Sequence, residues 1–206
     1  MIKVYAFATP NSVKVPIALE ELGLDYTLHG INVRKGEQKA PDFVTLNPNA
    51  KVPVLVDGDL VLTESAAILV YLAEKTGKLL PASGEGRARV FEQLFFHASG
   101  LGPAFGQAGF FKKQAAEQQP LAIARFAAEA ARTAGVLDAV LARQAFVAGD
   151  DISIADIAHF GWLWRRGFAE VDIAGLPNLS RWVAQIEARP AVQRAIARVE
   201  ALVPVA

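Results

Sequence analysis

The chain has 206 residues, of which 52% are hydrophobic, and its 21 basic and 21 acidic side chains leave no net charge. This balance excludes a nucleic-acid or anionic-membrane partner recruited through bulk charge, and no apolar run approaches the ~20 residues that span a bilayer. Cysteine is absent, which excludes disulfides, thiolate metal sites and a cysteine nucleophile. Any sulfur chemistry must therefore use a sulfur that arrives with a ligand.

Short β-rich runs and helical segments alternate in the first part of the chain. The expected strands cover Ile2–Phe7, Tyr26–Ile31, Val54–Val56 and Leu60–Leu62, and the expected helices cover Ser12–Gly23 and Thr63–Thr76. Ser12 is the predicted N-cap of the first helix, and residues 32–40 are predicted to be a loop. Because a helix separates the first two strands, they should pair in parallel. The last two should form an antiparallel hairpin around Asp57-Gly58.

Residues 77–86 (GKLLPASGEG) separate two regions of different character, because they are rich in glycine, proline and serine. We predict an α/β domain over 1–76, a linker over 77–86 and an all-helical domain over 87–206, where Ala-rich stretches dominate. The helices expected in the second domain cover Arg87–Gln107, Ala116–Arg143, Ser153–Arg166, and residues near 178–188 and 190–200.

A folding signal marks one helix start in the second domain. Ser153 and Asp156 have the spacing of a capping box, and Ile152 and Ile157 are placed as a hydrophobic staple. This arrangement satisfies helix N–H groups and needs no ligand, so we interpret it as structural.

Residues 52–74 place a bare backbone edge beside a helix N-terminus. Val52-Pro53 precedes the predicted hairpin, and the helix that follows opens on Glu64-Ser65. An extended peptide can pair with a free strand edge, and a carboxylate can sit at a helix N-terminus. The segment therefore predicts a cradle for a small acidic peptide.

These motifs resemble those of the cytosolic glutathione transferases over essentially the whole chain. The resemblance rests on Val52-Pro53, on Glu64-Ser65 and on GDDISIADIA, which contains the capping box. It implies a thioredoxin-like N-terminal domain, an all-helical C-terminal domain, glutathione as substrate or co-substrate, and no metal. Thr9-Pro10-Asn11, with residues 101–107 and 123–126, is similar to the bacterial Nu class. That class is associated with glutathione-dependent disulfide reduction and some peroxidase activity.

Thr9 and Asn11 are the catalytic candidates. An ordinary thiol has a pKa of about 8.5, and hydrogen-bond donors and a helix N-terminus facing the sulfur lower it. The Thr9 hydroxyl and the Asn11 amide stand just ahead of the first predicted helix. The alternative is that Thr9–Ser12 is only a turn with an N-cap.

The resemblance also implies four glutathione contacts around the hairpin. Glu64 and Ser65 would bind the γ-glutamyl end, and the backbone of Val52, which precedes Pro53 in a cis peptide, would pair with the cysteinyl unit. The alternatives are that an acidic first turn merely stabilises its helix and that Pro53 is an ordinary edge-strand proline.

Three further binding candidates depend mainly on the resemblance. Gln38 and Lys51 are the candidates for the glycyl carboxylate, and Arg125 matches an arginine of the Nu-class pattern. Each can equally be a solvated surface residue. Gly109-Phe110-Phe111 stands where that class often carries histidine, so the electrophile pocket should differ.

We expect an enzyme that reduces small disulfides with two glutathione molecules and accepts organic hydroperoxides as further substrates. The alternative is a non-catalytic glutathione-binding or interaction protein, since a fold does not establish an activity. The apolar N-terminus is too short for a secretory signal, which favours a cytoplasmic location. The resemblance, with surplus apolar surface at Phe91, Leu94 and Phe95, predicts a homodimer; neither nucleic acid nor a membrane is an expected partner.

Overall fold

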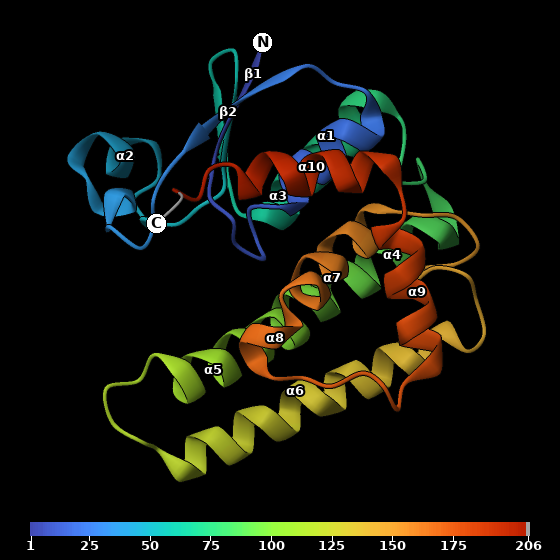
Figure 1. The fold of residues 1–206 in the computed structure, drawn as a ribbon. Coiled ribbons are helices and arrows are strands. Elements are labelled where there is room, and N and C mark those ends of the chain that lie inside the picture. Colours follow the sequence, from blue (N-terminus) through green and yellow to red (C-terminus); the bar gives the residue numbers. More distant parts are fainter. Residues whose placement is uncertain (205–206) are drawn as a thin grey trace. The chain divides into compact units, whose positions relative to one another are not determined.

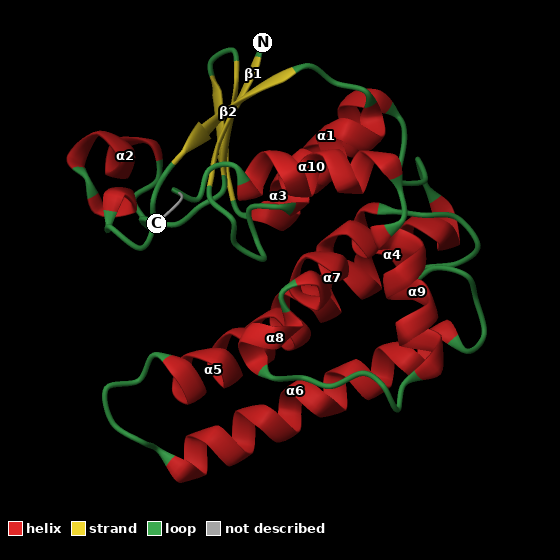
Figure 2. Ribbon diagram, viewed as in Figure 1, coloured by secondary structure: helices red, strands yellow, loops and turns green. Residues whose placement is uncertain are grey.

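The computed structural model describes residues 1–204 and divides into two compact units. The first contains Met1–Lys78 and the segment from Glu187 onward, and the second contains Leu79–Ile186. The predicted combination of a thioredoxin-like unit and a helical unit is confirmed (Figures 1 and 2). The last helix, however, belongs by its contacts to the first unit, which the predicted helical domain of 87–206 did not anticipate.

A four-stranded mixed sheet with the order β2-β1-β3-β4 forms the centre of the first unit. Its strands are β1 (Ile2–Ala6), β2 (Tyr26–Gly30), β3 (Val54–Asp57) and β4 (Leu60–Thr63). β1 pairs in parallel with β2, and β3 runs antiparallel to both β1 and β4, which confirms the predicted pairing. Gly58 supplies the positive φ of 62° in the hairpin turn. The alternating burial along β1 places Ile2, Val4 and Ala6 in the core.

Three helices, α1 (Lys14–Leu22), α3 (Ser65–Thr76) and α10 (Pro190–Glu200), lie on one side of this sheet, and α2 (Pro41–Leu46) lies on the other (Figures 1 and 2). α1 contacts both α3 and α10, and its apolar side chains are buried. Gly23, in the left-handed region, ends α1 as predicted. α2 and the 3-10 helix η1 (Glu37–Lys39) were not predicted, because six and three residues carry too little periodicity.

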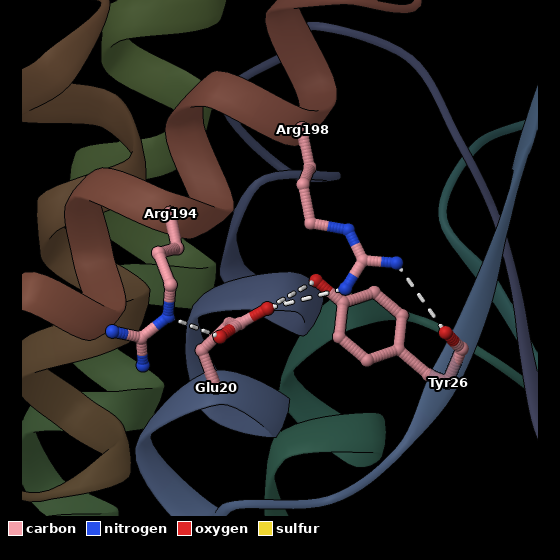
Figure 3. Close-up of polar contacts among 4 residues, drawn as sticks. All are labelled: Glu20, Tyr26, Arg194 and Arg198. Carbon is pink, nitrogen blue, oxygen red and sulfur yellow. Dashed lines mark hydrogen bonds and ion pairs between the residues drawn. The ribbon is translucent and has the colours of Figure 1, made fainter.

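An ion-pair network fastens α10 to α1 and β2 (Figure 3). The Glu20 carboxylate accepts hydrogen bonds from Arg194 Nε at 2.8 Å, Arg198 Nη1 at 3.2 Å and Tyr26 Oη at 3.1 Å. The Arg198 guanidinium lies 3.9 Å from the centroid of the Tyr26 ring. Burial by itself would raise the pKa of Glu20, but the hydrogen bonds from both arginines and Tyr26 outweigh it and hold that pKa below its ordinary value.

A second ion pair joins the same two helical regions. Arg189 donates from Nε and Nη2 to the two carboxylate oxygens of Glu21, at 2.6 and 2.8 Å. Such forked pairs have the geometry that gives an arginine–carboxylate contact its specificity. These bonds explain why the end of the chain packs with its beginning.

The second unit is built around α7 (Ile154–Trp164), whose residues from Ile154 to Leu163 are all buried. Its other helices are α4 (Gly84–Phe96), α5 (Gly102–Lys113), α6 (Pro120–Leu141), α8 (Arg166–Ala169) and α9 (Pro177–Glu187). The helical stretch expected over 87–107 is present, but the π-helix η2 (His97–Leu101) divides it into α4 and α5 just before Pro103. At Gly109 a Cβ would collide with the Phe168 ring, so this glycine serves packing.

The predicted capping box at the start of α7 is confirmed. Asp156 accepts hydrogen bonds from the Ser153 backbone and hydroxyl, both at 2.9 Å, from the Val147 N–H and from Trp182 Nε1. Burial raises the pKa of the Asp156 carboxyl, against these bonds, which favour the charged form. Within residues 1–204, no helix is both long and apolar enough to cross a membrane.

Candidate functional site

The polar candidates of the first unit meet where the loop after β1 reaches the start of α3. Lys14 Nζ donates to Asn11 Oδ1 at 2.7 Å and to Ser65 Oγ at 3.3 Å, joining residues 51 positions apart in the sequence. The structure therefore brings together the predicted sulfur-facing residue Asn11 and the predicted carboxylate-binding residue Ser65.

Thr9 and Ser12 form a closed pair ahead of α1. The Thr9 hydroxyl donates to Ser12 Oγ at 2.9 Å and accepts from the Ser12 N–H at 3.1 Å. The prediction that Ser12 is the N-cap was wrong: Val13 occupies that position and no side chain caps the helix. An N-cap serine acts through its side-chain oxygen, which accepts a helix N–H, but the Ser12 Oγ accepts from the Thr9 hydroxyl instead.

The Thr9 hydroxyl can nevertheless serve a ligand, because a hydroxyl pair can exchange donor and acceptor roles by rotation. If Ser12, which is fully buried, donates its proton to Thr9 instead, the Thr9 proton turns away from Ser12. Thr9 itself is half-buried, so its oxygen remains accessible to a ligand.

Glu64 occupies the N-cap of α3 in a strained conformation. Its φ of 64° and ψ of 111° are uncommon for a residue with a side chain, while its carbonyl accepts the first helical bond from the Ile68 N–H at 3.0 Å. The side chain is exposed and does not cap the helix. The first N–H groups of α3 are thus left for an anion, and Ser65 lies beside them.

The peptide bond between Val52 and Pro53 is cis, as the resemblance implied. Pro53 is buried, Val52 is half-buried, and both precede the first residue of β3. Lys51 is exposed, and its carbonyl accepts from the buried Asn47 amide at 2.8 Å. This bond holds the backbone that leads into the Val52-Pro53 corner.

The two remaining candidates, Gln38 and Arg125, lie on different elements of different units. Gln38 sits on η1, and its Oε1 is buried without a hydrogen-bond partner. Arg125 is exposed on α6, in the second unit, so its assignment to the site stays a prediction. In the described part of the chain, no group of three or more histidine, aspartate or glutamate residues is placed to hold a metal ion.

Lys14 is the residue that the sequence reasoning missed. Its side chain is 1% exposed, and burial lowers its pKa from 10.5 to about 7, while the nearby charge of Glu64 acts in the opposite direction. A signal was present in the sequence, because Lys14 is the single charge inside the otherwise apolar segment VKVPIAL. A lysine inside an apolar run that becomes a buried helix is a candidate for a special role.

This fold, with its cis Val52-Pro53 bond and its polar cluster at the starts of α1 and α3, is that of the glutathione transferases. The model of the glutathione S-transferase N-terminal domain matches residues 1–74, and that of the C-terminal domain matches residues 103–190. The chain therefore belongs to the glutathione S-transferase family.

Individual proteins are similar to this chain over nearly its whole length. The disulfide-bond oxidoreductase YfcG of Escherichia coli is 38% identical over 209 residues, covering 97% of this chain and 96% of the relative. A glutathione transferase family member from Pseudomonas fluorescens, solved with two glutathione bound, superimposes with a TM-score of 0.91 at 40% identity, over 95% of this chain and 92% of that one. A glutathione transferase from Pseudomonas putida, solved with one glutathione disulfide per subunit, gives 0.89 at 37% identity, over 95% and 90%.

Proposed function

We propose that this protein reduces small disulfides with two molecules of glutathione. The observation that carries the proposal is the open cluster at the start of α1 and α3, where Asn11, Lys14 and Ser65 are held together. The chain contains no cysteine, so both reducing thiols must come from the ligand. Glutathione supplies a thiol and two carboxylates, which match a site rich in donors.

The reaction balances with glutathione as the only reductant. The thiolate of the first glutathione attacks one sulfur of the disulfide, a new S–S bond forms, and the other sulfur leaves and takes up a proton. A second glutathione thiolate then attacks the glutathione sulfur of this mixed disulfide and releases the remaining thiol. Two glutathione thiols are oxidised to one disulfide, and one substrate disulfide is reduced to two thiols.

Thr9 and Asn11 are proposed to stabilise the attacking thiolate. Free glutathione is mostly thiol at pH 7, since an ordinary thiol has a pKa of about 8.5. Lowering it by two units requires about 2.7 kcal/mol of preferential thiolate stabilisation. Two hydrogen bonds to a charged acceptor, each worth about 1.5–3 kcal/mol, are sufficient.

The other contacts follow the polarity of glutathione. Ser65 and the free N–H groups of α3 suit the α-carboxylate of the γ-glutamyl unit, and the exposed carboxylate of Glu64 suits its ammonium. The backbone of Val52 beside Pro53 is proposed to pair with the cysteinyl unit, and Gln38 and Lys51 to bind the glycyl carboxylate.

Three relatives support this assignment. The YfcG protein is named a disulfide-bond oxidoreductase, the P. fluorescens protein binds two glutathione, and the P. putida protein binds glutathione disulfide. These ligands match the reactants and the product of the proposed reaction. Arg125 is proposed as a further glutathione contact.

A turnover screen tests the proposal directly. Purified protein with glutathione is offered a small dialkyl disulfide, an organic hydroperoxide and an aryl halide in parallel. We expect the fastest turnover with the disulfide, a slower reaction with the hydroperoxide and the slowest conjugation. Retention on immobilised glutathione without turnover of any of the three would instead indicate a non-catalytic binding protein.

We further propose a cytoplasmic homodimer. Phe95 on α4 is an exposed large hydrophobic residue that stacks on Phe91 with ring centroids 6.0 Å apart, so α4 has exposed apolar surface that a two-fold contact would cover. Light scattering at micromolar concentration should give about twice the chain's 22.1 kDa. A mass equal to that of one chain would contradict the dimer.

A further inference from the structure

A buried lysine joins the two ends of the candidate glutathione site. Lys14 Nζ lies 2.7 Å from Asn11 Oδ1, at the sulfur end, and 3.3 Å from Ser65 Oγ, at the γ-glutamyl end. The side chain is almost completely buried, and burying an ammonium group is costly unless it is paired. A methionine of similar length would fill the same space without that cost, so packing alone does not account for a charge here.

The chemistry of the ammonium group fixes the orientation of both neighbours. An ammonium has three donors and no acceptor, so Asn11 must direct its carbonyl oxygen toward Lys14 and its amide N–H groups away from it. Ser65 accepts with its oxygen, which leaves its own hydroxyl proton to donate elsewhere. Both residues therefore present donors to a ligand, as a thiolate and a carboxylate require.

We propose that Lys14 is a positioning residue that turns the Asn11 amide and the Ser65 hydroxyl toward the two anionic ends of bound glutathione. This inference rests on the proposed function, since it assumes that glutathione occupies this site. The same charge favours an anion at both ends, so Lys14 couples thiolate formation to capture of the α-carboxylate.

The charged groups around the Lys14 ammonium set the pH range over which it keeps its proton. Glu64 attracts it across the start of α3, while burial lowers its pKa to about 7. The other charged or titratable groups on α1 and on the helices packed against it have partners of their own or are exposed. Glu20 and Glu21 bind Arg189, Arg194 and Arg198, Tyr71 and Lys75 bind Asp57, and Glu74 and Glu200 are exposed. The charge on Lys14 should therefore be lost between pH 6 and 8.5, and a second anion should help to retain it.

Bound glutathione provides the test, without turnover. Lys14→Met removes the charge and keeps the length, whereas Lys14→Arg keeps a donor-only cation. Lys75→Met is the matched control, because it removes an ammonium group that binds Asp57 outside the site. The pKa of the bound thiol is measured by thiolate absorbance, and glutathione affinity by calorimetry.

We expect Lys14→Met to raise the pKa of the bound thiol by about one unit and to weaken glutathione binding about tenfold, since it removes one charged contact. Lys14→Arg should keep the thiol pKa and the glutathione affinity close to those of the wild type, and Lys75→Met should change neither of these two quantities. In an Asn11→Ala background, Lys14→Met should shift the thiol pKa by less than half as much, because the two residues act as one unit. A folded Lys14→Met variant with an unchanged thiol pKa would overturn the proposal.

Wild-type protein gives a second test that does not depend on the folding of a variant. S-methylglutathione keeps the carboxylates but has no thiol to titrate. Its affinity should fall about three- to tenfold from pH 6 to 8.5 as Lys14 loses its proton, by linkage; a constant affinity would overturn the proposal. If the protein binds glutathione but reduces no disulfide, the proposed function fails while both tests still decide the role of Lys14. If it binds no glutathione, both fail.

Discussion

The starts of α7 and α1 each hold a buried ionisable side chain in a polar cluster, yet the two clusters are built differently. Around α7, the Asp156 carboxylate receives four hydrogen bonds from neighbouring protein groups. Around α1, Lys14 holds Asn11 and Ser65 by their oxygens and leaves their remaining donors directed elsewhere. Burial favours the neutral form of both Asp156 and Lys14.

A structural cluster and a ligand site differ in how many of their hydrogen-bond donors the protein itself satisfies. A closed cluster meets its own hydrogen-bonding needs, so its loss should unfold the protein. An open cluster presents unmet donors, so its loss should mainly change binding and rate. Proteins keep such destabilising arrangements where function requires them.

The largest effect on stability is expected from removing the carboxylate of the closed cluster around Asp156. Asp156→Ala leaves four buried donors without a hydrogen-bond acceptor. It should lower the free energy of unfolding by about 3–5 kcal/mol, measured by denaturant titration. The exposed Asp151→Ala is the control and should have little effect. A small loss in Asp156→Ala would show that the cluster is not a structural hub.

Removing the charge of Lys14 should change the free energy of unfolding in the opposite direction to Asp156→Ala. Below pH 7 it is charged in both the folded and the unfolded chain, and the folded chain bears the burial cost. Between its folded pKa of about 7 and the ordinary 10.5, the unfolded chain binds more protons, so the free energy of unfolding rises with pH. At about 1.4 kcal/mol per pKa unit, that shift sets an upper limit of about 5 kcal/mol.

Lys14→Met should therefore be more stable than wild type near pH 6, and the gap should narrow toward pH 10. Thermal melting at several pH values measures this difference, and the exposed Lys35→Met should track wild type throughout. A gap that widens as pH rises would contradict the buried-charge interpretation.

Substitutions at the sulfur end of the candidate glutathione site should lower the rate of the reaction. Thr9→Ala and Asn11→Ala should each lower kcat about 10- to 100-fold, because each removes a donor to the developing thiolate, with smaller changes in glutathione affinity. Steady-state kinetics and calorimetry separate the two effects. Full activity in both variants with all three electrophiles would exclude these residues from catalysis.

Substitutions at the γ-glutamyl end of the candidate site should weaken the binding of glutathione. Ser65→Ala and Glu64→Gln should weaken glutathione binding by about 1–1.5 kcal/mol, since their contacts are shared by ground and transition states. Calorimetry reports the affinity, and kcat at saturating glutathione should stay near wild type. Unchanged affinity in both variants would count against the cradle.

The smallest effect is expected at the ion-pair network of α10, where the partly exposed Arg194 and Arg198 meet Glu20. Glu20→Gln weakens the contact with Arg194 and Arg198 and should cost about 0.5–1 kcal/mol. Because the folded pKa of Glu20 lies below its ordinary value, its stabilisation is present above the unfolded pKa and is lost as pH falls through the folded value. Melting from pH 6 to 3 should show the Glu20→Gln difference shrinking, while the exposed Glu117→Gln should match wild type.

Features encoded over short stretches of sequence were predictable. The hairpin at Asp57-Gly58 and the Ser153–Asp156 capping box depend on residues a few positions apart, and both formed as expected. Thr9, Asn11, Glu64 and Ser65 lie in one unit, and the Lys14 contacts join Asn11 to Ser65. The contact of each with glutathione stays a prediction.

Features that depend on distant packing were not predictable. Lysine is usually exposed, and the burial of Lys14 depends on elements far apart in the sequence that pack around α1, including the start of α3. The place of α10 depends on pairs such as Glu20 with Arg194, 174 positions apart. At Ser12 the local N-cap pattern was present, but the Ser12 Oγ accepts from the nearby Thr9 hydroxyl and caps no helix N–H.

The return of α10 to the first unit also has a consequence for biosynthesis. The first unit contains Met1–Lys78 and the segment from Glu187 onward, so a ribosome must add the whole helical unit before α10 can dock. At about 5–20 residues per second, the stretch from Lys78 to Arg198 takes roughly 6–24 s. Throughout that interval the waiting surface of α1 carries Glu20 and Glu21, whose carboxylates favour water over nonspecific association with other nascent chains.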